Sequence, residues 1–363
     1  MKHSIQQGES FLKALSSRLL LLDGSTGVEF QRLKLTEEEV RGRRFLTHPR
    51  MLAANFDILN LSRPELVAKV HTRYLRAGAD IIETNTFNST ALSQTEYGTG
   101  ELDFELNLSG ARIARREADR FTAMNPARPR FVAGSMGPTA LSASLPVDVS
   151  DPAKRAVDFD TLAENYARQA LGLIEGGADF LLIETAFDIL NVKAALEGAA
   201  RSMDKLDTDI PVVISLTISD ASGRILSGHT PEAILAVLAP FRPAAIGFNC
   251  SAGPETLSRF TREFAAISPF PVIFYPNAGL PDRMGNYSIA PAGFAESLRP
   301  LIGDRIISII GGCCGTGPDH IAAVASLIEE CGDSPRKLPE EIRLPWLAGM
   351  EPFYDDRGFI NVA

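Results

Sequence analysis

Eight short apolar runs recur along the chain, and each is nearly continuous in Val, Ile, Leu or Phe. Runs of this kind are typical of strands that are covered on both faces, as in a parallel sheet. Each run turns polar or glycine-rich at its C-terminal end. The runs occupy residues 18–24, 79–87, 130–138, 179–188, 211–220, 244–250, 271–279 and 305–314.

Helical patterns fill the gaps between the runs, and several of them open with a proline near the first turn. Eight strands that alternate with eight helices predict a (β/α)8 barrel, the α/β fold of the TIM type. A doubly wound open sheet is the alternative, and the count of eight favours a closed ring. The predicted helices cover residues 64–79, 106–121, 161–178, 189–203, 230–241, 253–267, 290–302 and 317–331.

Two segments fall outside this alternation. Residues 25–63 stand between the first strand and its helix, and they are too many for a plain connection. Residues 338–363 follow the last helix and carry proline and aromatic residues. We therefore expect a single barrel domain over residues 1–337, with an insert after its first strand and a C-terminal extension over residues 338–363.

Composition narrows the classes of function. Of the 363 residues, 45% are hydrophobic and 22% are charged, and the net charge is −9. Acidic and basic residues are interspersed without a basic stripe, so we expect no nucleic-acid partner. The apolar runs are too short to span a bilayer, and the N-terminus lacks a signal-peptide pattern. We expect a cytoplasmic protein with no membrane partner, whose four cysteines form no disulfide framework.

Three of the four cysteines stand at predicted strand ends. The active site of a (β/α)8 barrel lies at the C-terminal ends of the strands, so Cys250, Cys313 and Cys314 can face one point. Three thiolates around one point indicate zinc, which binds sulfur in tetrahedral geometry and keeps one position open at catalytic sites. With sulfur ligands alone, the ion favours a soft fourth ligand such as a substrate thiol.

The glycines around the cysteine pair support this interpretation. Neighbouring side chains of a regular strand point to opposite faces, so adjacent cysteines bind one ion only where the backbone leaves strand geometry. Gly311, Gly312 and Gly315 permit that departure. Two alternatives stay open. Cysteine often serves as a small buried hydrophobe, which is our interpretation of Cys331 in its helical pattern, and the adjacent pair could form a strained, redox-active disulfide.

Groups at other strand ends suit the rest of an amino acid. Asp23 ends the first strand and Glu184 ends the fourth, and such carboxylates can bind an ammonium group through charge-assisted hydrogen bonds. The backbone N–H groups of Gly24 and Ser25 could hold a carboxylate, as other anion-binding turns do. These features predict a substrate amino acid that carries a thiol. The alternative for either acid is a solvated loop residue or a helix cap.

Other candidate groups carry less weight. The five histidines show no clustering, and we interpret His71 and His320 as helix residues of no special role. An aldolase-like barrel enzyme needs a reactive lysine, whereas Lys193, the nearest candidate, lies in a predicted helix instead of at a strand end. A non-catalytic module that binds zinc or thiols, such as a redox sensor, stays open as an alternative to an enzyme.

Four motifs together resemble the zinc-dependent homocysteine S-methyltransferase family: LLDGSTG, ADIIETNTF, GFNCSAGP and GGCCGTGPDHI. The resemblance covers about residues 15–335. It implies a barrel in which the three strand-end cysteines hold zinc and homocysteine binds through its thiol. It also implies that the amino group of homocysteine meets the two carboxylates named above, and that its carboxylate meets the backbone around Gly24 and Ser25.

Members of this family differ in their methyl donor. The insert and the following motif, LTEEEVRGRRF to ADIIETNTFNST, resemble the N-terminal homocysteine-binding module of cobalamin-dependent methionine synthase. The tail GMEPFYDDRGFINVA resembles the join between that module and the folate-binding domain. The resemblance implies methylcobalamin as donor, on a missing domain or on a partner subunit that binds cobalamin and folate, and we expect a naturally split subunit. S-methylmethionine and betaine are the alternative donors.

Overall fold

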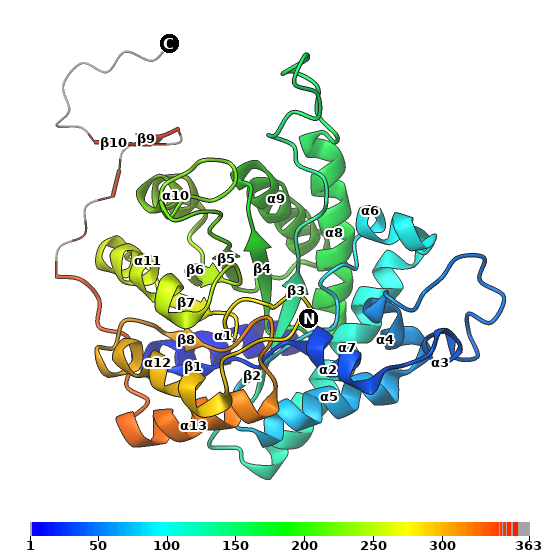
Figure 1. The fold of residues 1–363 in the computed structure, drawn as a ribbon, viewed down its shortest axis with the longest axis horizontal. Helices are drawn as coiled ribbons and strands as arrows, with labels where there is room; N and C mark the ends of the chain where they lie inside the picture. The colour runs from blue at the N-terminus through cyan, green and yellow to red at the C-terminus, as the bar shows by residue number, and fades with distance from the viewer. Residues whose placement is uncertain (1, 341, 343, 346, 350, 355–363) are drawn as a thin grey trace.

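The predicted strands form one parallel sheet in the computed structural model, which describes residues 2–340, 342, 344–345, 347–349 and 351–354. The eight strands follow one another in the order β1-β8-β7-β6-β5-β4-β3-β2. The ring closes between β1 and β2, where Leu22 pairs with Ile81 and the Asp80 N–H donates to the Leu21 carbonyl over 2.7 Å. The chain therefore forms the predicted (β/α)8 barrel, with helices around the strands (Figure 1).

Each strand is followed by the helix that the sequence pattern predicts. The strands are β1 (Leu20–Leu21), β2 (Ile81–Glu83), β3 (Phe131–Met136), β4 (Phe180–Ala186), β5 (Val212–Leu216), β6 (Ala245–Asn249), β7 (Val272–Tyr275) and β8 (Ile309–Ile310). The helices that cover them are α5 (Pro64–Arg76), α7 (Asp103–Met124), α8 (Phe159–Gly176), α9 (Ile189–Leu206), α10 (Pro231–Leu238), α11 (Pro254–Ile267), α12 (Pro291–Gly303) and α13 (Pro318–Cys331). Shorter helices in the connections are α6 (Ala91–Gln94), η2 (Thr95–Tyr97), η3 (Gly100–Leu102) and η4 (Ala239–Phe241).

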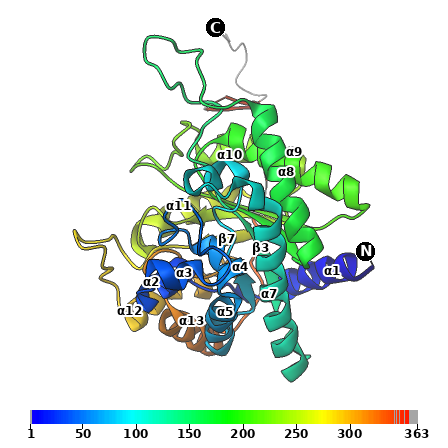
Figure 2. The same ribbon diagram turned by 90° about the vertical axis from the view of Figure 1, so that its right-hand side faces the viewer.

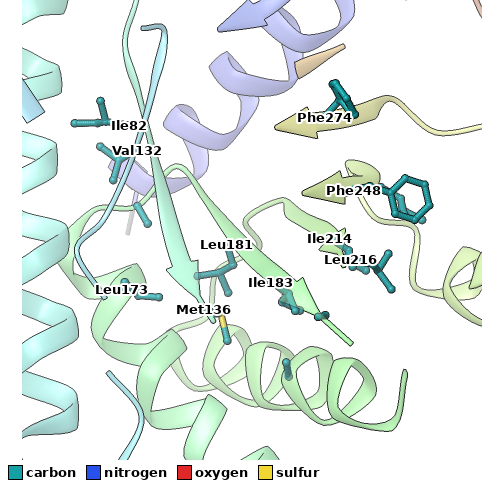
Figure 3. Close-up of a cluster of buried hydrophobic side chains, with 14 of the residues drawn as sticks. Ile82, Val132, Met136, Leu173, Leu181, Ile183, Ile214, Leu216, Phe248 and Phe274 are labelled. Carbon is teal, nitrogen blue, oxygen red and sulfur yellow. The ribbon is translucent and has the colours of Figure 1, made fainter. Parts of the chain in front are cut away.

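Alternate strand residues contribute to two separate apolar cores. Residues that point into the barrel, such as Leu182 and Ile273, pack on one another inside the ring. Residues of the opposite parity, such as Leu181 and Ile183, pack with the surrounding helices (Figure 3). Because a strand has a side-chain period of two, both faces must be apolar here, and this explains the near-continuous runs in the sequence.

The N-terminal helix α1 (Lys2–Ser17), which the sequence patterns did not predict, closes one end of the barrel. The Phe11 ring stacks on Phe180 with centroids 4.1 Å apart and meets Phe131 edge-on at 5.7 Å. Both partners are the first residues of their strands, so α1 covers the end opposite to the predicted active site. Figure 2 shows α1 projecting from one side of the molecule.

The predicted insert forms structure of its own beside the barrel. It contains α2 (Thr26–Leu33), α3 (Glu37–Arg41), the 3-10 turn η1 (Phe56–Ile58) and α4 (Leu59–Ser62). Thr36 and Glu39 form a reciprocal capping box at the start of α3. The Glu37 carboxylate accepts hydrogen bonds from the Leu52 and Ala53 N–H groups, which ties the following loop to this helix.

The described part of the C-terminal extension lies against α10. β9 (Leu347–Ala348) pairs antiparallel with β10 (Pro352–Phe353), and Glu351 forms an ion pair with Arg224. Just before the extension, the buried Arg336 guanidinium donates to backbone carbonyls at the end of α11. The boundary at residue 337 stays a prediction, and residues 341, 343, 346, 350 and 355–363 lie outside the described residues.

Within the described residues, no helix has the length and apolar character needed to cross a membrane.

Phe11→Ala should lower the free energy of unfolding by about 3–5 kcal/mol, because it removes a fully buried ring from the end of the barrel and leaves a cavity. The matched control is Leu12→Ala, since that neighbouring side chain is 43% exposed. Urea denaturation of both variants measures the difference. Equal losses in the two variants would show that α1 does not seal the barrel.

Candidate metal centre and substrate cavity

The structure brings together the three cysteines that the sequence singles out at strand ends. Cys250 follows the last residue of β6, and Cys313 and Cys314 follow β8 after two glycines. The Sγ atom of Cys314 lies 3.9 Å from that of Cys250 and 4.0 Å from that of Cys313. All three sulfur atoms lie within 4.8 Å of one another, so they can act on a common ion.

The spacing of the sulfur atoms fits zinc. Sulfur ligands at about 2.3 Å from a tetrahedral zinc ion lie about 3.8 Å from one another. The observed separations of 3.9 and 4.0 Å agree with this value, whereas a disulfide requires about 2.05 Å. All three cysteines are free thiols. A site with three sulfur donors is one that zinc prefers, so the residues present fit the ion that the sequence predicts.

A short extension of β7 holds the two cysteine segments together. The Cys250 N–H donates to the Tyr275 carbonyl over 3.3 Å, and the Cys313 N–H donates to the Pro276 carbonyl over 2.8 Å. The next N–H along the chain donates to the side-chain oxygen of Asn277 over 3.0 Å. The last residue of β7 and the two residues after it therefore hold the backbone of all three cysteines.

The glycines beside the cysteine pair are required by the space around them. A Cβ atom on Gly312 would lie 2.5 Å from the Thr316 hydroxyl, and one on Gly315 would lie 2.2 Å from the Tyr287 ring. Gly315 also has a φ of 81°, in the left-handed region that favours glycine. Cys250 itself has a φ of 59°, a strained conformation of the kind that clusters at functional sites.

Asn249 connects the cysteine cluster to neighbouring strands. Its side-chain oxygen accepts hydrogen bonds from the Ser215 hydroxyl at 2.7 Å and from the Thr185 N–H at 3.1 Å. Its Nδ2 atom donates to the Thr185 hydroxyl over 2.8 Å and lies 3.7 Å from the Cys313 sulfur. Outer partners of this kind orient metal ligands, so β4 and β5 help to place a sulfur atom that β8 presents.

The three thiols do not ionise equally. Hydrogen bonds from the Cys313 and Cys314 thiols lower the pKa of Cys250, whereas the hydrogen bonds of Cys313 with Cys250 and Cys314 raise the pKa of Cys313. The cluster therefore favours a first thiolate at Cys250. Because the thiolate is the form that binds a metal ion, the cluster is prepared for metal before all three protons are lost.

A cavity of about 250 Å³ opens beside the thiols. It is smaller than the roughly 300–1,000 Å³ of pockets that hold drug-sized ligands, so it suits a small molecule. The lining combines the cysteine cluster with the carboxylates of Glu83 and Glu184. Two aromatic rings, those of Phe56 and Phe87, also line it. The cavity is therefore polar where the thiols and carboxylates meet it and apolar where the rings do.

Buried carboxylates gather at the cavity. Burial raises the pKa of Asp23 and of Glu83 well above the usual range, and repulsion from Glu184 adds to both shifts. Burial also raises the pKa of Glu184 to about 7, although the Ser135 and Tyr275 hydroxyls donate to its two oxygens and oppose the rise. A cation near these groups would favour their ionised forms.

The end of β1 lies partly outside the cavity lining. Asp23 is fully buried, and neither Asp23 nor Gly24 is among the described residues that line the cavity. A Cβ atom on Gly24 would lie 2.8 Å from the Thr316 hydroxyl, so close packing accounts for this glycine. The predicted contacts of Asp23 and Gly24 with a substrate stay predictions.

The start of α2 faces the cavity. Ser25, Thr26 and Gly27 line it, and the Ser25 hydroxyl caps the helix by accepting a hydrogen bond from the Val28 N–H over 3.3 Å. The first N–H groups of a helix lack partners within the helix, and the helix dipole favours an anion there. The Ser25 N–H itself donates to the Thr316 hydroxyl over 3.3 Å, and the predicted binding of an anion at Gly24 and Ser25 stays a prediction.

Comparison with known proteins agrees with this geometry. Residues 20–328 match the family model described as homocysteine S-methyltransferase. The chain belongs to the homocysteine S-methyltransferase family. The resemblance inferred from the four motifs is thereby confirmed, and the chemistry of the family is methyl transfer.

The fold of this homocysteine S-methyltransferase family member is similar to solved structures of the homocysteine methyltransferase MmuM from Escherichia coli. The metallated form is 22% identical, with a TM-score of 0.67 over 88% of this chain and 99% of that chain. The oxidized form is 23% identical, with a TM-score of 0.66 over 85% of this chain and 95% of that chain. At this level of identity the likeness shows a shared fold.

Glu83 is a cavity residue that was not predicted from the sequence. It lines the cavity at the end of β2, and its Oε1 atom is buried without a partner among the described residues. A repeat in the sequence could have identified it. Gly-Ala-Asp at 78–80 and at 177–179 is followed in each case by Glu-Thr, at 83–84 and at 184–185.

Four further residues that the sequence brought into question lie outside the cavity lining. The prediction that Cys331 is buried is wrong, because it is exposed and its sulfur lies 3.6 Å from the Arg299 guanidinium. His71 is fully buried, and burial lowers its pKa to about 4. His320 caps α13, since the N–H of the residue before the helix donates to its Nδ1 over 3.2 Å. Lys193 lies in α9, as predicted, and does not line the cavity.

Cys250→Ser should abolish stoichiometric zinc binding, because a hydroxyl replaces one of three thiolate ligands. Cys331→Ser is the matched control and should keep its zinc, since Cys331 is exposed and outside the cluster. Zinc and protein concentrations measured after dialysis against metal-free buffer check both variants. Full zinc occupancy in Cys250→Ser would contradict the assignment of this ligand.

Glu184→Gln should stabilise the metal-free protein at pH 8 by roughly 1–3 kcal/mol. The pKa of this carboxyl is about 7 in the folded state and 4.5 ordinarily. At a pH above 4.5, the unfolded chain ionises the carboxyl more readily than the folded protein does, so the carboxyl opposes folding. The gain should shrink as the pH falls toward 4.5, where the carboxyl is protonated in both states. Urea denaturation at a series of pH values measures it. A gain that does not depend on pH would point to packing instead of ionisation.

Proposed function

We propose that the protein transfers a methyl group to the sulfur of homocysteine and so forms methionine. The observation that carries the proposal is a cavity of about 250 Å³ that joins a cysteine cluster, buried carboxylates and the start of a helix. Membership of the homocysteine S-methyltransferase family supports the same reaction.

Each end of homocysteine has a group of matching chemistry in this cavity. The carboxylates of Glu83 and Glu184, together with the buried Asp23, suit the ammonium group through charge-assisted hydrogen bonds. The N–H groups of Thr26 and Gly27, which lack partners within the helix, suit the carboxylate. With both polar groups of the amino acid held in this way, its sulfur is directed to the cysteine cluster.

The metal that suits this cluster is zinc, and Cys250, Cys313 and Cys314 would hold it. Zinc bound there supplies a lowered pKa for the substrate thiol, which is ordinarily about 8.5, and so keeps the sulfur nucleophilic at neutral pH.

The side chains of this protein then position the substrate. The Ser135 and Tyr275 hydroxyls hold the two oxygens of Glu184, so this carboxylate keeps a fixed direction at the cavity. The Asn249 amide, which is held by the Thr185 N–H, donates to the Cys313 sulfur and so helps to fix its position. Fixing the amino acid at both polar ends places its sulfur for attack, so orientation is the chain's main contribution to methyl transfer.

We further propose methylcobalamin as the donor, carried by another domain or by a partner subunit of methionine synthase that binds cobalamin and folate. The insert and the C-terminal extension carry the resemblance to cobalamin-dependent methionine synthase. In the structure the insert is part of the site, because it contributes Thr26, Gly27, Phe56 and Asp57 to the cavity lining. The segment that resembles the cobalamin-dependent enzyme therefore also lines the proposed substrate cavity.

Zinc-loaded protein should convert homocysteine to methionine with methylcobalamin, and should do so faster than with S-methylmethionine or betaine. The expectation follows from a cavity built partly by the insert. Methionine formed over time is quantified by mass spectrometry for each donor at equal concentration. Cys250→Ser, treated in the same way, is the negative control because it lacks one metal ligand.

The other outcomes of this assay separate the alternatives. Turnover with S-methylmethionine or betaine alone would replace the proposed donor and keep the methyltransferase. Zinc-loaded protein that makes no methionine from any of the three donors would favour the non-catalytic module that binds zinc or thiols.

A further inference from the structure

Two carboxylate oxygens beside the cavity have no hydrogen-bond partner among the described residues, although both are buried. They are Oε1 of Glu83 and Oδ1 of Asp23. Glu184 differs from them, because the hydroxyls of Ser135 and Tyr275 donate to its two oxygens. Buried acceptors in native proteins are nearly always paired. Glu83 lines the cavity, so a molecule bound there can supply the donor that its Oε1 atom lacks.

The three carboxylates act on one another through space. Glu184 raises the pKa of both Asp23 and Glu83 by repulsion, and Asp23 raises that of Glu83. A cation placed among them would remove this repulsion. A primary ammonium group carries three N–H donors, which is one for each carboxylate.

We propose that Glu83 is a third acceptor for the α-ammonium group of the substrate, beside Asp23 and Glu184. This inference rests on the proposed function, since it places homocysteine in the cavity. It deepens that function by assigning a source of specificity. A ligand that lacks the amine leaves buried acceptors unpaired, so the site rejects it in favour of an amino acid with a primary amine.

The structure shows no other use for the Glu83 side chain. It makes no hydrogen bond or ion pair with any described residue, whereas the Glu83 backbone N–H donates to Asp23 Oδ2 over 3.1 Å. Glu83 is also paired with Ala133 in the register of β2 and β3. The backbone is thus held independently of the side chain, and a change of the side chain leaves the strand in place.

The test compares two ligands on the zinc-loaded full-length chain by isothermal titration calorimetry. One is L-homocysteine and the other is 4-mercaptobutanoate, which keeps the thiol and the carboxylate but has no amine. Glu83→Gln should weaken the binding of homocysteine by about tenfold or more, as expected for the loss of a charge-assisted hydrogen bond. Its affinity for 4-mercaptobutanoate should stay unchanged, so the preference of the wild type for the amine falls.

Glu175→Gln is the matched control, because it makes the same chemical change at an exposed position of α8 and should leave both affinities unchanged. Zinc content and melting temperature are measured for each variant. If Glu83→Gln does not fold, Glu83→Asp replaces it with the same expectation, since it withdraws the carboxylate by one methylene.

Two results would overturn the inference: an equal loss of affinity for both ligands, which marks a structural role, or no loss for either. Failure of the zinc-loaded wild type to bind homocysteine is a different result. It would overturn the proposed function and the inference with it, whatever the variants do.

Discussion

The site depends above all on the backbone hydrogen bonds that tie the loops after β6 and β8 to the last residue of β7 and the residue after it. Tyr275 and Pro276 accept from the N–H groups of Cys250 and Cys313, so one short segment sets the distance between two cysteine loops that are far apart in the sequence. The thiols consequently stand at ligand spacing within the barrel framework. The backbone hydrogen bonds of the barrel therefore contribute to the spacing of the three sulfur atoms.

The carboxylates beside the cavity lower the stability of the folded protein. Asp23, Glu83 and Glu184 are carboxylates brought together under conditions that raise the pKa of each. Grouping buried acids opposes folding at neutral pH, because charge is removed from water and placed beside like charge. A cationic ligand reverses the sign of both effects. In the proposed function, the same arrangement that destabilises the free protein provides affinity and selectivity for an ammonium group, which is a common relation between active sites and stability.

The sequence predicted the barrel and the thiol cluster well, for a physical reason. Strands buried on both faces read as continuous apolar runs, and side chains at their C-terminal ends must meet at one end of a closed ring. What it could not predict depends on the assembled surface. Phe11 is a core residue only because the barrel end exists for it to cover. Cys331 continues the buried stripe of its helix in the sequence but is exposed, and it is the last residue of α13. The unpaired oxygen of Glu83 is visible only in the folded structure, although the repeat in the sequence points to the residue.

The repeated Gly-Ala-Asp and Glu-Thr pattern shows how one strand unit serves both ends of the barrel. At the N-terminal ends of the strands, Asp80 accepts a hydrogen bond from the Leu21 N–H over 3.1 Å. Asp179 likewise accepts from the Val132 N–H over 2.6 Å. Each Asp therefore ties its strand to the preceding strand. At the C-terminal ends of the strands, each repeat places a glutamate at the cavity, Glu83 from β2 and Glu184 from β4. β4 is irregular there, with a shift of register between Ile183 and Ala186 against β5. Two residues lie in that irregularity. Glu184 lines the cavity, and Thr185 forms hydrogen bonds with the Asn249 side chain. Bulges re-aim side chains next to active sites, and this one connects the carboxylate that suits the substrate amine to the residue that supports the cysteine cluster.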